Sequence, residues 1–293
     1  MNQKLGKPQP DSDVVNKEPK VLLIGYGWVG QYMGKYFTKA HYAGSSGKVY
    51  SVENNEEVKP LYYDLAIISV PTPMNPETGQ CDTSIVESVI EKYRDMVDIF
   101  LIKSTVEIGT SRRLQEKYNT RVCMSPEYVG ETLGHPLLEA RRDAFQIIGG
   151  DGGSRERVAS MFMKVLNANA PIYLVNHEEA EIIKYCENMW IMQRVDYWND
   201  VFDIAIAHGV SFVNVREGLV LDPRFSRTHS NVYWENRGWS GKCLPKDMNA
   251  LVYSMRKKNY PLKTVETQIQ KNCDVRIGYK NSVRLKPIEP SWE

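Results

Sequence analysis

The sequence has no long apolar run and no excess of charge of one sign. No apolar stretch approaches the roughly 18 residues that a membrane-spanning helix needs, and the first twenty residues lack the apolar centre of a signal peptide. Thirty-seven basic residues stand against 36 acidic ones, a formal charge of +1, so there is no field of one sign to recruit nucleic acid or a membrane surface. We therefore expect a cytoplasmic protein that binds neither, and that holds any anionic ligand in a local site.

Cysteine is scarce. The five cysteines are an odd number without a C-x-x-C pair, which argues against a disulfide framework and against a zinc or other metal site. Each is either a small apolar core residue or a reactive thiol. They are Cys81, Cys123, Cys186, Cys243 and Cys273.

Short apolar runs recur through the first half of the chain, separated by helix-length segments or loops. Continuous apolar runs are typical of strands buried on both faces of a parallel sheet, and their alternation with helices predicts a doubly wound α/β fold. The first helix is expected at residues 28–39. The expected strands lie at residues 20–25, 48–52, 63–70, 98–104, 121–125, 144–150 and 171–175.

The second half of the chain has the pattern of a helical domain. From Glu178 to His208, apolar and aromatic residues recur at helical spacing with neither proline nor glycine, which predicts one long helix. A loop-like stretch comes next at residues 222–246, and a further amphipathic helix is expected at residues 247–259. At the end of the chain, "NSVRLKPIEPSWE" has the proline and charge content of a tail or an irregular cap.

A glycine-rich turn follows the first expected strand and opens the first helix. Its residues are Gly25, Tyr26, Gly27, Trp28, Val29 and Gly30. Glycines in this context permit a tight turn, a close pyrophosphate and close packing of helix on strand, with the helix N-terminus facing the phosphates. This predicts a Rossmann-type domain that binds a dinucleotide.

Glu53 follows the second expected strand. A carboxylate there would accept hydrogen bonds from the adenosine ribose and would favour NAD over NADP, because a 2′-phosphate would meet a like charge. The alternative is a solvated glutamate beside Glu56 and Glu57.

Five further motifs occur in order along the chain: "ISVPTP", "IKSTVEIGT", "SPEYVGE", "EAEIIKYCEN" and "GWSGKCLPKD". With the glycine-rich turn, this set resembles the UDP-glucose/GDP-mannose dehydrogenases from about Lys20 to about Asn259. The resemblance implies an NAD-dependent, four-electron oxidation of a UDP-hexose, UDP-glucose above all, to the uronic acid through a cysteine thioester. It also implies a homodimer built on the long helix.

These patterns divide the chain into four predicted segments. A disordered leader occupies residues 1–19, an NAD-binding Rossmann domain residues 20–176, an all-helical substrate and dimerisation domain residues 177–270, and an irregular tail residues 271–293.

Cys243 is the best candidate for the nucleophile. It lies in a glycine-bearing loop between Lys242 and Lys246, and nearby cations favour the nucleophilic thiolate. Lys184 and Asn188 are four residues apart on the long helix, so both side chains share one face and can stabilise the same developing oxyanion. An exposed lysine and asparagine on an amphipathic helix is the alternative for this pair.

The resemblance assigns the remaining roles. Glu127 matches a base for thioester hydrolysis, although an ordinary loop carboxylate is the alternative, and Thr105 and Asp247 match residues that position a water molecule. Arg224 resembles an arginine that reaches the sugar from the partner subunit. The implied cofactor contacts beyond the turn and Glu53 are Thr72, Thr105, Glu131 and Lys246. The implied substrate contacts are Glu127, Tyr128, Val129, Lys184, Asn188, Arg224, Gly238 and Gly241.

The sequence also departs from the family. Glu107 replaces a proline, Ser240 replaces a glycine, and the stretch after Asn259 is too short for the family's second Rossmann-like domain, which grips the nucleotide. Two alternatives therefore stay open: a two-electron NAD-dependent dehydrogenase of a smaller hydroxy compound, and an NAD-binding or interaction protein without turnover. A separate chain that supplies the missing domain is a further alternative.

Overall fold

The computed structural model describes residues 18–130 and 143–280 and divides the chain into two compact units. Unit 1 comprises Met1–Asn75 and Cys81–Lys184, and unit 2 comprises Pro76–Gln80 and Tyr185–Glu293. The units divide within the long helix, after the boundary expected at residue 176. Nearly all of the expected leader, the residue Glu131 and the last thirteen residues of the chain (281–293) lie outside the described residues.

Unit 1 is built on a mixed sheet, as the apolar runs predict. Within the described residues the strand order is β4-β3-β2-β1-β5-β6-β7-β8-β9. The β1, β2, β5, β6 and β7 strands pair in parallel, and β8 joins β7 in the antiparallel sense through Met124 and Gly149. The bounds are β1 Val21–Ile24, β2 His41–Ala43, β3 Val49–Ser51, β4 Glu57–Val58, β5 Tyr63–Ile68, β6 Val97–Ile102, β7 Arg121–Met124, β8 Gln146–Gly149 and β9 Ile172–Val175.

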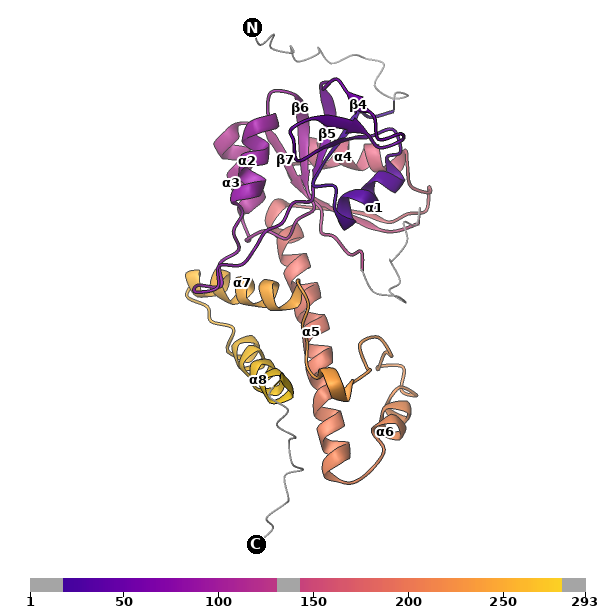
Figure 1. The fold of residues 1–293 in the computed structure, drawn as a ribbon, viewed down its shortest axis with the longest axis vertical. Helices are drawn as coiled ribbons and strands as arrows, with labels where there is room; N and C mark the ends of the chain where they lie inside the picture. The colour runs from indigo at the N-terminus through magenta and orange to yellow at the C-terminus, as the bar shows by residue number, and fades with distance from the viewer. Residues whose placement is uncertain (1–17, 131–142, 281–293) are drawn as a thin grey trace. The chain divides into compact units, whose positions relative to one another are not determined.

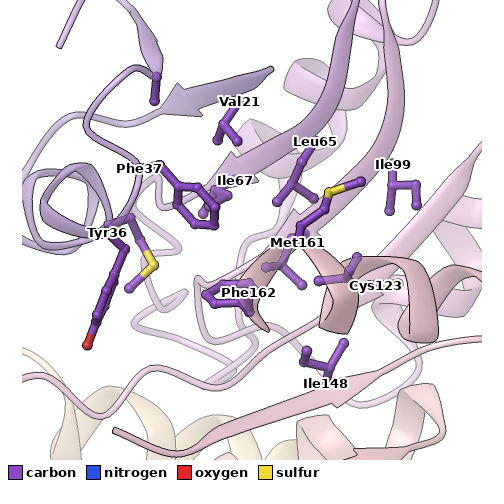
Figure 2. Packing of buried hydrophobic residues seen from close by; sticks show 14 of the residues in the cluster. Val21, Tyr36, Phe37, Leu65, Ile67, Ile99, Cys123, Ile148, Met161 and Phe162 are labelled. Atoms are coloured by element: carbon purple, nitrogen blue, oxygen red, sulfur yellow. The ribbon is translucent and has the colours of Figure 1, made fainter. Parts of the chain in front are cut away.

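Helices cover both faces of this sheet (Figure 1). Helices α1 (Trp28–Tyr36) and α4 (Gly152–Met163) bury side chains on one face, and α2 (Ser84–Tyr93) and α3 (Thr110–Tyr118) on the other. Figure 2 shows Phe37, at the end of α1, and Phe162, on α4, beside strand residues such as Ile67. The rings of Phe37 and Phe162 meet edge to face, with centroids 5.3 Å apart, so α1 and α4 share one apolar cluster on their face of the sheet. The expected doubly wound fold is confirmed.

The second strand of the parallel sheet differs from the prediction. The strand parallel to β1 is His41–Ala43, and Val49–Ser51 runs back antiparallel to it. A tight turn closes this hairpin, with the Gly44 amide donating to the Lys48 carbonyl at 2.9 Å and Gly47 at φ +83°. The prediction missed β2 because its three half-buried residues form no apolar run.

Helix α5, His177–Ala207, begins in unit 1 and ends in unit 2. It confirms the long helix expected at residues 178–208. Around its second half, unit 2 adds α6 (Phe212–Leu219), a 3-10 turn (Trp234–Asn236), α7 (Leu244–Lys257) and α8 (Lys263–Lys280). Among the described residues, no helix is both long and apolar enough to cross a membrane.

Helix α8 corrects the expected tail. Residues 271–280, predicted to be irregular, continue the helix that begins at Lys263. Val265 and Ile269 pack into the apolar cluster that contains Met248 of α7, while Asn272 exchanges hydrogen bonds of 2.8 and 3.0 Å with the backbone of Trp239. Few apolar side chains anchor this helix, so its sequence shows little amphipathic pattern.

Candidate active site

The glycine-rich turn has the geometry of a phosphate-binding loop. Gly25 has φ +89°, and a Cβ atom there would lie 2.5 Å from the Ser69 carbonyl oxygen, while one on Gly30 would lie 2.1 Å from the carbonyl oxygen of Gly25. Nothing lies within 4 Å of a Cβ atom on Gly27, the N-cap of α1, which has no side-chain cap. The amides that open α1 can therefore donate hydrogen bonds to the pyrophosphate of a dinucleotide. The fold of unit 1 fits NAD at this point.

The other residues of the turn differ in exposure. Trp28 is exposed and Val29 half-buried. The ring of Tyr26 stacks on that of Tyr42 in β2, with centroids 4.1 Å apart and planes 9° from parallel. This stack attaches the turn to the neighbouring strand.

Glu53 does not occupy the position predicted for it. It follows β3, which runs antiparallel to β2, and the Val52 amide before it donates to the carbonyl of Ala40, the residue that precedes β2. Glu53 thus lies at the edge of the sheet where β2 begins, whereas the glycine-rich turn lies where β1 ends. The prediction that Glu53 ends the second parallel strand is wrong. The residues that follow β2 are Gly44, Ser45 and Ser46, without a carboxylate.

The loops that follow β5 and β6 are tied together. The Thr72 hydroxyl donates to the Thr105 carbonyl at 2.7 Å, and the Ser104 hydroxyl donates to the Val70 carbonyl at 2.7 Å. Thr72 is buried and Thr105 half-buried. The two threonines predicted as cofactor contacts therefore lie side by side at the edge where β1 also ends.

Glu127 follows β7 at the same edge. Its Oε1 accepts the amides of Tyr128 and Val129 at 2.8 and 2.9 Å, and its Oε2 lies 3.6 Å from the ammonium of Lys103. The Lys184 ammonium lies 5.2 Å from the centre of the Tyr128 ring. Unit 1 thus brings together four of the predicted site residues and adds Lys103, to which the sequence interpretation gave no role.

Unit 2 brings a second group of predicted residues together. Cys243 is exposed and is the N-cap of α7, and its carbonyl accepts the amide of Asp247 at 2.8 Å. Asp247 is buried, accepts a 2.6 Å hydrogen bond from the side-chain amide of Asn188 and pairs with Lys246. Asn188 lies one turn after Lys184 on α5. The start of α7 thus brings together the Cys243 thiol, the Asp247 carboxylate, the Asn188 amide and the Lys246 ammonium.

The loop that precedes Cys243 is held on both sides within unit 2. Gly238 has φ +76°, and a Cβ atom on it would lie 2.4 Å from Oδ1 of Asn272, so a larger residue would strain the backbone and displace the Asn272 side chain. The Trp239 indole donates to Asp196 of α5 at 2.9 Å, and burial raises the pKa of Asp196 to about 6. Gly241 has φ +87° with open space around it. Neither Trp239 nor Asp196 was identified from the sequence, because nothing in the motif indicates an indole partner on a distant helix.

Arg224 stands apart from these groups. Its side chain is exposed and bonds Asp222, two residues earlier in the same loop, at 2.6 to 3.1 Å.

Among the described residues, no cluster of three or more His, Cys, Asp or Glu side chains could hold a metal ion.

The start of α5 is fastened to α3 by buried polar groups that the sequence interpretation also missed. The Glu181 carboxylate accepts the amides of Gly109 and Ser111 and the Ser111 hydroxyl at 2.5, 2.8 and 2.7 Å. The buried His177 ring lies 3.1 Å from the same hydroxyl. Burial raises the pKa of Glu181 to about 7 and lowers that of His177.

Comparison with known protein families matches both units. The NAD binding domain of the UDP-glucose/GDP-mannose dehydrogenase family matches residues 41–166, and the central domain of the same family matches residues 178–274. Together the two matches cover well over half of the chain. The chain belongs to this dehydrogenase family. NAD is accordingly the cofactor of unit 1, although the glycine-rich turn precedes the matched residues.

Relatives within the dehydrogenase family share low sequence identity with this chain, but the alignments cover most of it. The UDP-glucose 6-dehydrogenase of Campylobacter jejuni is 24% identical, with 86% of this chain and 72% of that protein aligned. The enzyme of Streptococcus pneumoniae is 31% identical, with 72% of this chain and 55% of that protein aligned. For TuaD of Bacillus subtilis, also a UDP-glucose 6-dehydrogenase, identity is 28% and the chain spans 47% of the relative. The chain therefore spans about half the length of several relatives.

A solved structure confirms the architecture. A UDP-glucose dehydrogenase from Pyrobaculum islandicum superposes with a TM-score of 0.72 at 19% identity, covering 91% of this chain and 70% of that one. At this identity the likeness establishes the dehydrogenase fold.

Proposed function

We propose that this protein is an NAD-dependent nucleotide-sugar 6-dehydrogenase that oxidises a UDP-hexose, with UDP-glucose as the leading substrate, to the uronic acid. One observation carries the proposal. Cys243 caps α7 one turn from the buried Asp247, which in turn bonds Asn188. A thiol at a helix N-terminus beside an ordered acid and amide is suited to covalent carbonyl chemistry.

The reaction proceeds in three chemical stages. The C6 alcohol loses a proton and a hydride and becomes an aldehyde; the Cys243 thiolate then adds to the carbonyl carbon, and loss of a second hydride leaves a thioester. Water cleaves the carbon–sulfur bond and returns the thiolate. Bound NAD supplies the hydride acceptor for both oxidations. One CH₂OH group, two NAD⁺ and one water thus give one carboxylate, two NADH and three protons.

The chain's own residues supply the polar groups for these stages. Lys184 and Asn188 donate to the oxygen that becomes an alkoxide and later a tetrahedral oxyanion; each such donor is worth up to about 3 kcal/mol. Glu127 takes the proton of the hydrolytic water, which Thr105 and Asp247 orient. Tyr128, Val129, Gly238 and Gly241 line the path of the substrate.

The dinucleotide is held by the turn from Gly25 to Gly30, whose open Gly27 admits a phosphate. Thr72, Thr105 and Lys246 complete its contacts, together with Glu131 from the segment outside the described residues. The adenosine ribose meets the hydroxyls of Ser45 and Ser46, which follow β2, in place of Glu53.

The proposed assembly is a homodimer in which Arg224 reaches the sugar of the partner subunit. The support is the apolar surface of unit 2: Trp190 and Ile204 of α5 and Val213 of α6 are each more than half exposed. Exposed apolar side chains on neighbouring helices are typical of an interface.

The test is the yield of NADH per acid formed. Purified protein with UDP-glucose, other UDP-hexoses and GDP-mannose should release two NADH per uronic acid, and Cys243→Ser should stop net acid production while NAD binding persists. Wild-type acid yield in Cys243→Ser would eliminate the thioester route. One NADH per turnover with a non-nucleotide alcohol would identify a two-electron dehydrogenase, and NAD binding without reduction across the panel would identify a binding protein.

A further inference from the structure

We propose that Lys103, a buried lysine at the end of β6, is a positioning residue that holds the carboxylate of Glu127 in place. The inference rests on the proposed function for its catalytic meaning, because Glu127 is the base proposed for thioester hydrolysis. The structural part, one buried ammonium fixing one carboxylate, stands within unit 1 alone.

Lys103 is placed where a lysine is costly. It follows the largely buried strand β6, and its side chain is 3% exposed. Removing an ammonium from water is unfavourable unless acceptors and a counter-charge replace the solvent. The glycine-rich turn, Thr72 and Thr105 lie at the same edge of the sheet as Lys103. A role at this edge would explain why the chain buries a lysine there.

Three oxygen atoms surround the Lys103 ammonium. The Lys103 Nζ lies 3.0 Å from the Ser125 hydroxyl, 3.2 Å from the Gln146 side-chain oxygen and 3.4 Å from the Pro126 carbonyl. An ammonium has three N–H donors and no acceptor, so these three oxygens match the charged form. Burial lowers the pKa of Lys103, and the Glu127 carboxylate opposes this lowering.

Glu127 is held from two sides. Its Oε1 accepts the amides of Tyr128 and Val129. Its Oε2 is buried, has no hydrogen-bond partner among the described residues, and faces the Lys103 ammonium at 3.6 Å. An ion pair at this distance fixes the side chain and leaves Oε2 with the lone pairs that a water molecule needs. Lys184 is a second cation near Lys103, and its charge lowers the pKa of Lys103.

The experiment compares Lys103→Met, which keeps the length of the side chain and removes its charge, with wild type. Lys117→Met is the matched control, because Lys117 is an exposed lysine paired with Glu87 on the same domain. The first readout is amide hydrogen exchange, which requires no activity. Exchange at Tyr128 and Val129 should accelerate about tenfold or more in Lys103→Met, whereas the amides of β5 and all amides of Lys117→Met should keep their wild-type rates.

The second readout is the effect on kcat compared with the effect on KM. Loss of the positioned base should lower kcat, with KM for NAD unchanged within about twofold. Lys103→Met should add no further loss to Glu127→Gln, because both changes disable the same group.

The outcomes separate the two proposals. Wild-type exchange at Tyr128 and Val129 in Lys103→Met would overturn the positioning role, and so would faster exchange confined to Ser125 and Gln146. If the wild-type protein reduces no NAD with any nucleotide sugar, the proposed function fails, while the exchange data still decide whether Lys103 holds Glu127.

Discussion

A single side chain, Glu53, shows how strand direction decides what a residue can reach. In the linear sequence it follows an apolar run, as the ribose-binding acid of a Rossmann domain does. In the folded protein that run is the returning arm of a hairpin, so Glu53 lies at the edge where β2 begins. The position after β2 is taken by Gly44 and Ser45, and only hydroxyl and backbone groups are available there.

Replacing Glu53 with alanine should therefore leave the KM for NAD within about twofold of wild type. The informative companion is Ser45→Asp, which places a carboxylate after β2 and should lower the KM for NAD relative to that for NADP. Steady-state kinetics with both dinucleotides measures this. A large rise in the KM for NAD in Glu53→Ala alone would contradict the placement of Glu53.

The residues that sequence could identify are those with a short-range reason for meeting. Lys184 and Asn188 are one helical turn apart, so spacing alone places the pair on one face, whereas Asp247 was assigned only through the family resemblance. Lys103, Trp239 and Glu181 acquire their partners only when separate elements pack together. A lysine after a buried strand or a tryptophan in a loop carries no sequence signal of those partners.

At the level of elements, several polar side chains hold α3 against α5. The Glu181 carboxylate accepts the first amides of α3, which favours a negative charge there. Burial outweighs this stabilisation and raises the pKa of Glu181 from 4.5 to about 7. The folded protein thus binds this proton more tightly than the unfolded chain does.

Stability from this proton is fully present below about pH 4.5 and is lost as the pH rises through 7. Relative to Glu181→Gln, whose side chain stays neutral, the free energy of unfolding of wild type should fall by up to about 3 kcal/mol between pH 4.5 and 8. Urea unfolding at a series of pH values measures the difference.

Glu178 provides the control. Its pairing with Arg112 lowers the pKa of Glu178 to about 2. Its contribution to the free energy of unfolding is therefore lost only as the pH falls from 4.5 through 2. The difference between wild type and Glu178→Gln should be flat from pH 4.5 to 8. A flat difference for Glu181→Gln as well would show that the proton on Glu181 is bound no more tightly in the folded state.

Elements were predictable where one physical signal was strong. Buried strands such as β5 and β6 are apolar except for one aspartate each, and α5 has 31 residues without proline or glycine. The β2 strand and α8 were missed because each owes its existence to neighbours: β2 pairs β1 through three half-buried residues, and α8 is anchored by few apolar side chains and Asn272.

At the level of the whole molecule, the exposed apolar side chains of unit 2 predict self-association. Light scattering should give a mass near twice the 33.6 kDa of the chain, because burying Trp190, Ile204 and Val213 removes apolar area from water. Trp190→Glu and Ile204→Glu should each yield a monomer. Met163→Glu, at an equally exposed apolar position on α4, should remain dimeric. A monomeric wild type, or dissociation by the α4 variant, would contradict this interface.

The chain passes between the two units three times, because residues Pro76 to Gln80 belong to unit 2. It leaves unit 1 after Asn75, returns at Cys81 and leaves again after Lys184. A truncation at any one of these points would leave part of one unit attached to the other. The segment from Pro76 to Gln80 contains Gly79, which lies against the backbone of Asn249. Expressing the two units separately, or exchanging them with those of a relative, therefore requires the segment from Pro76 to Gln80 to be kept with unit 2.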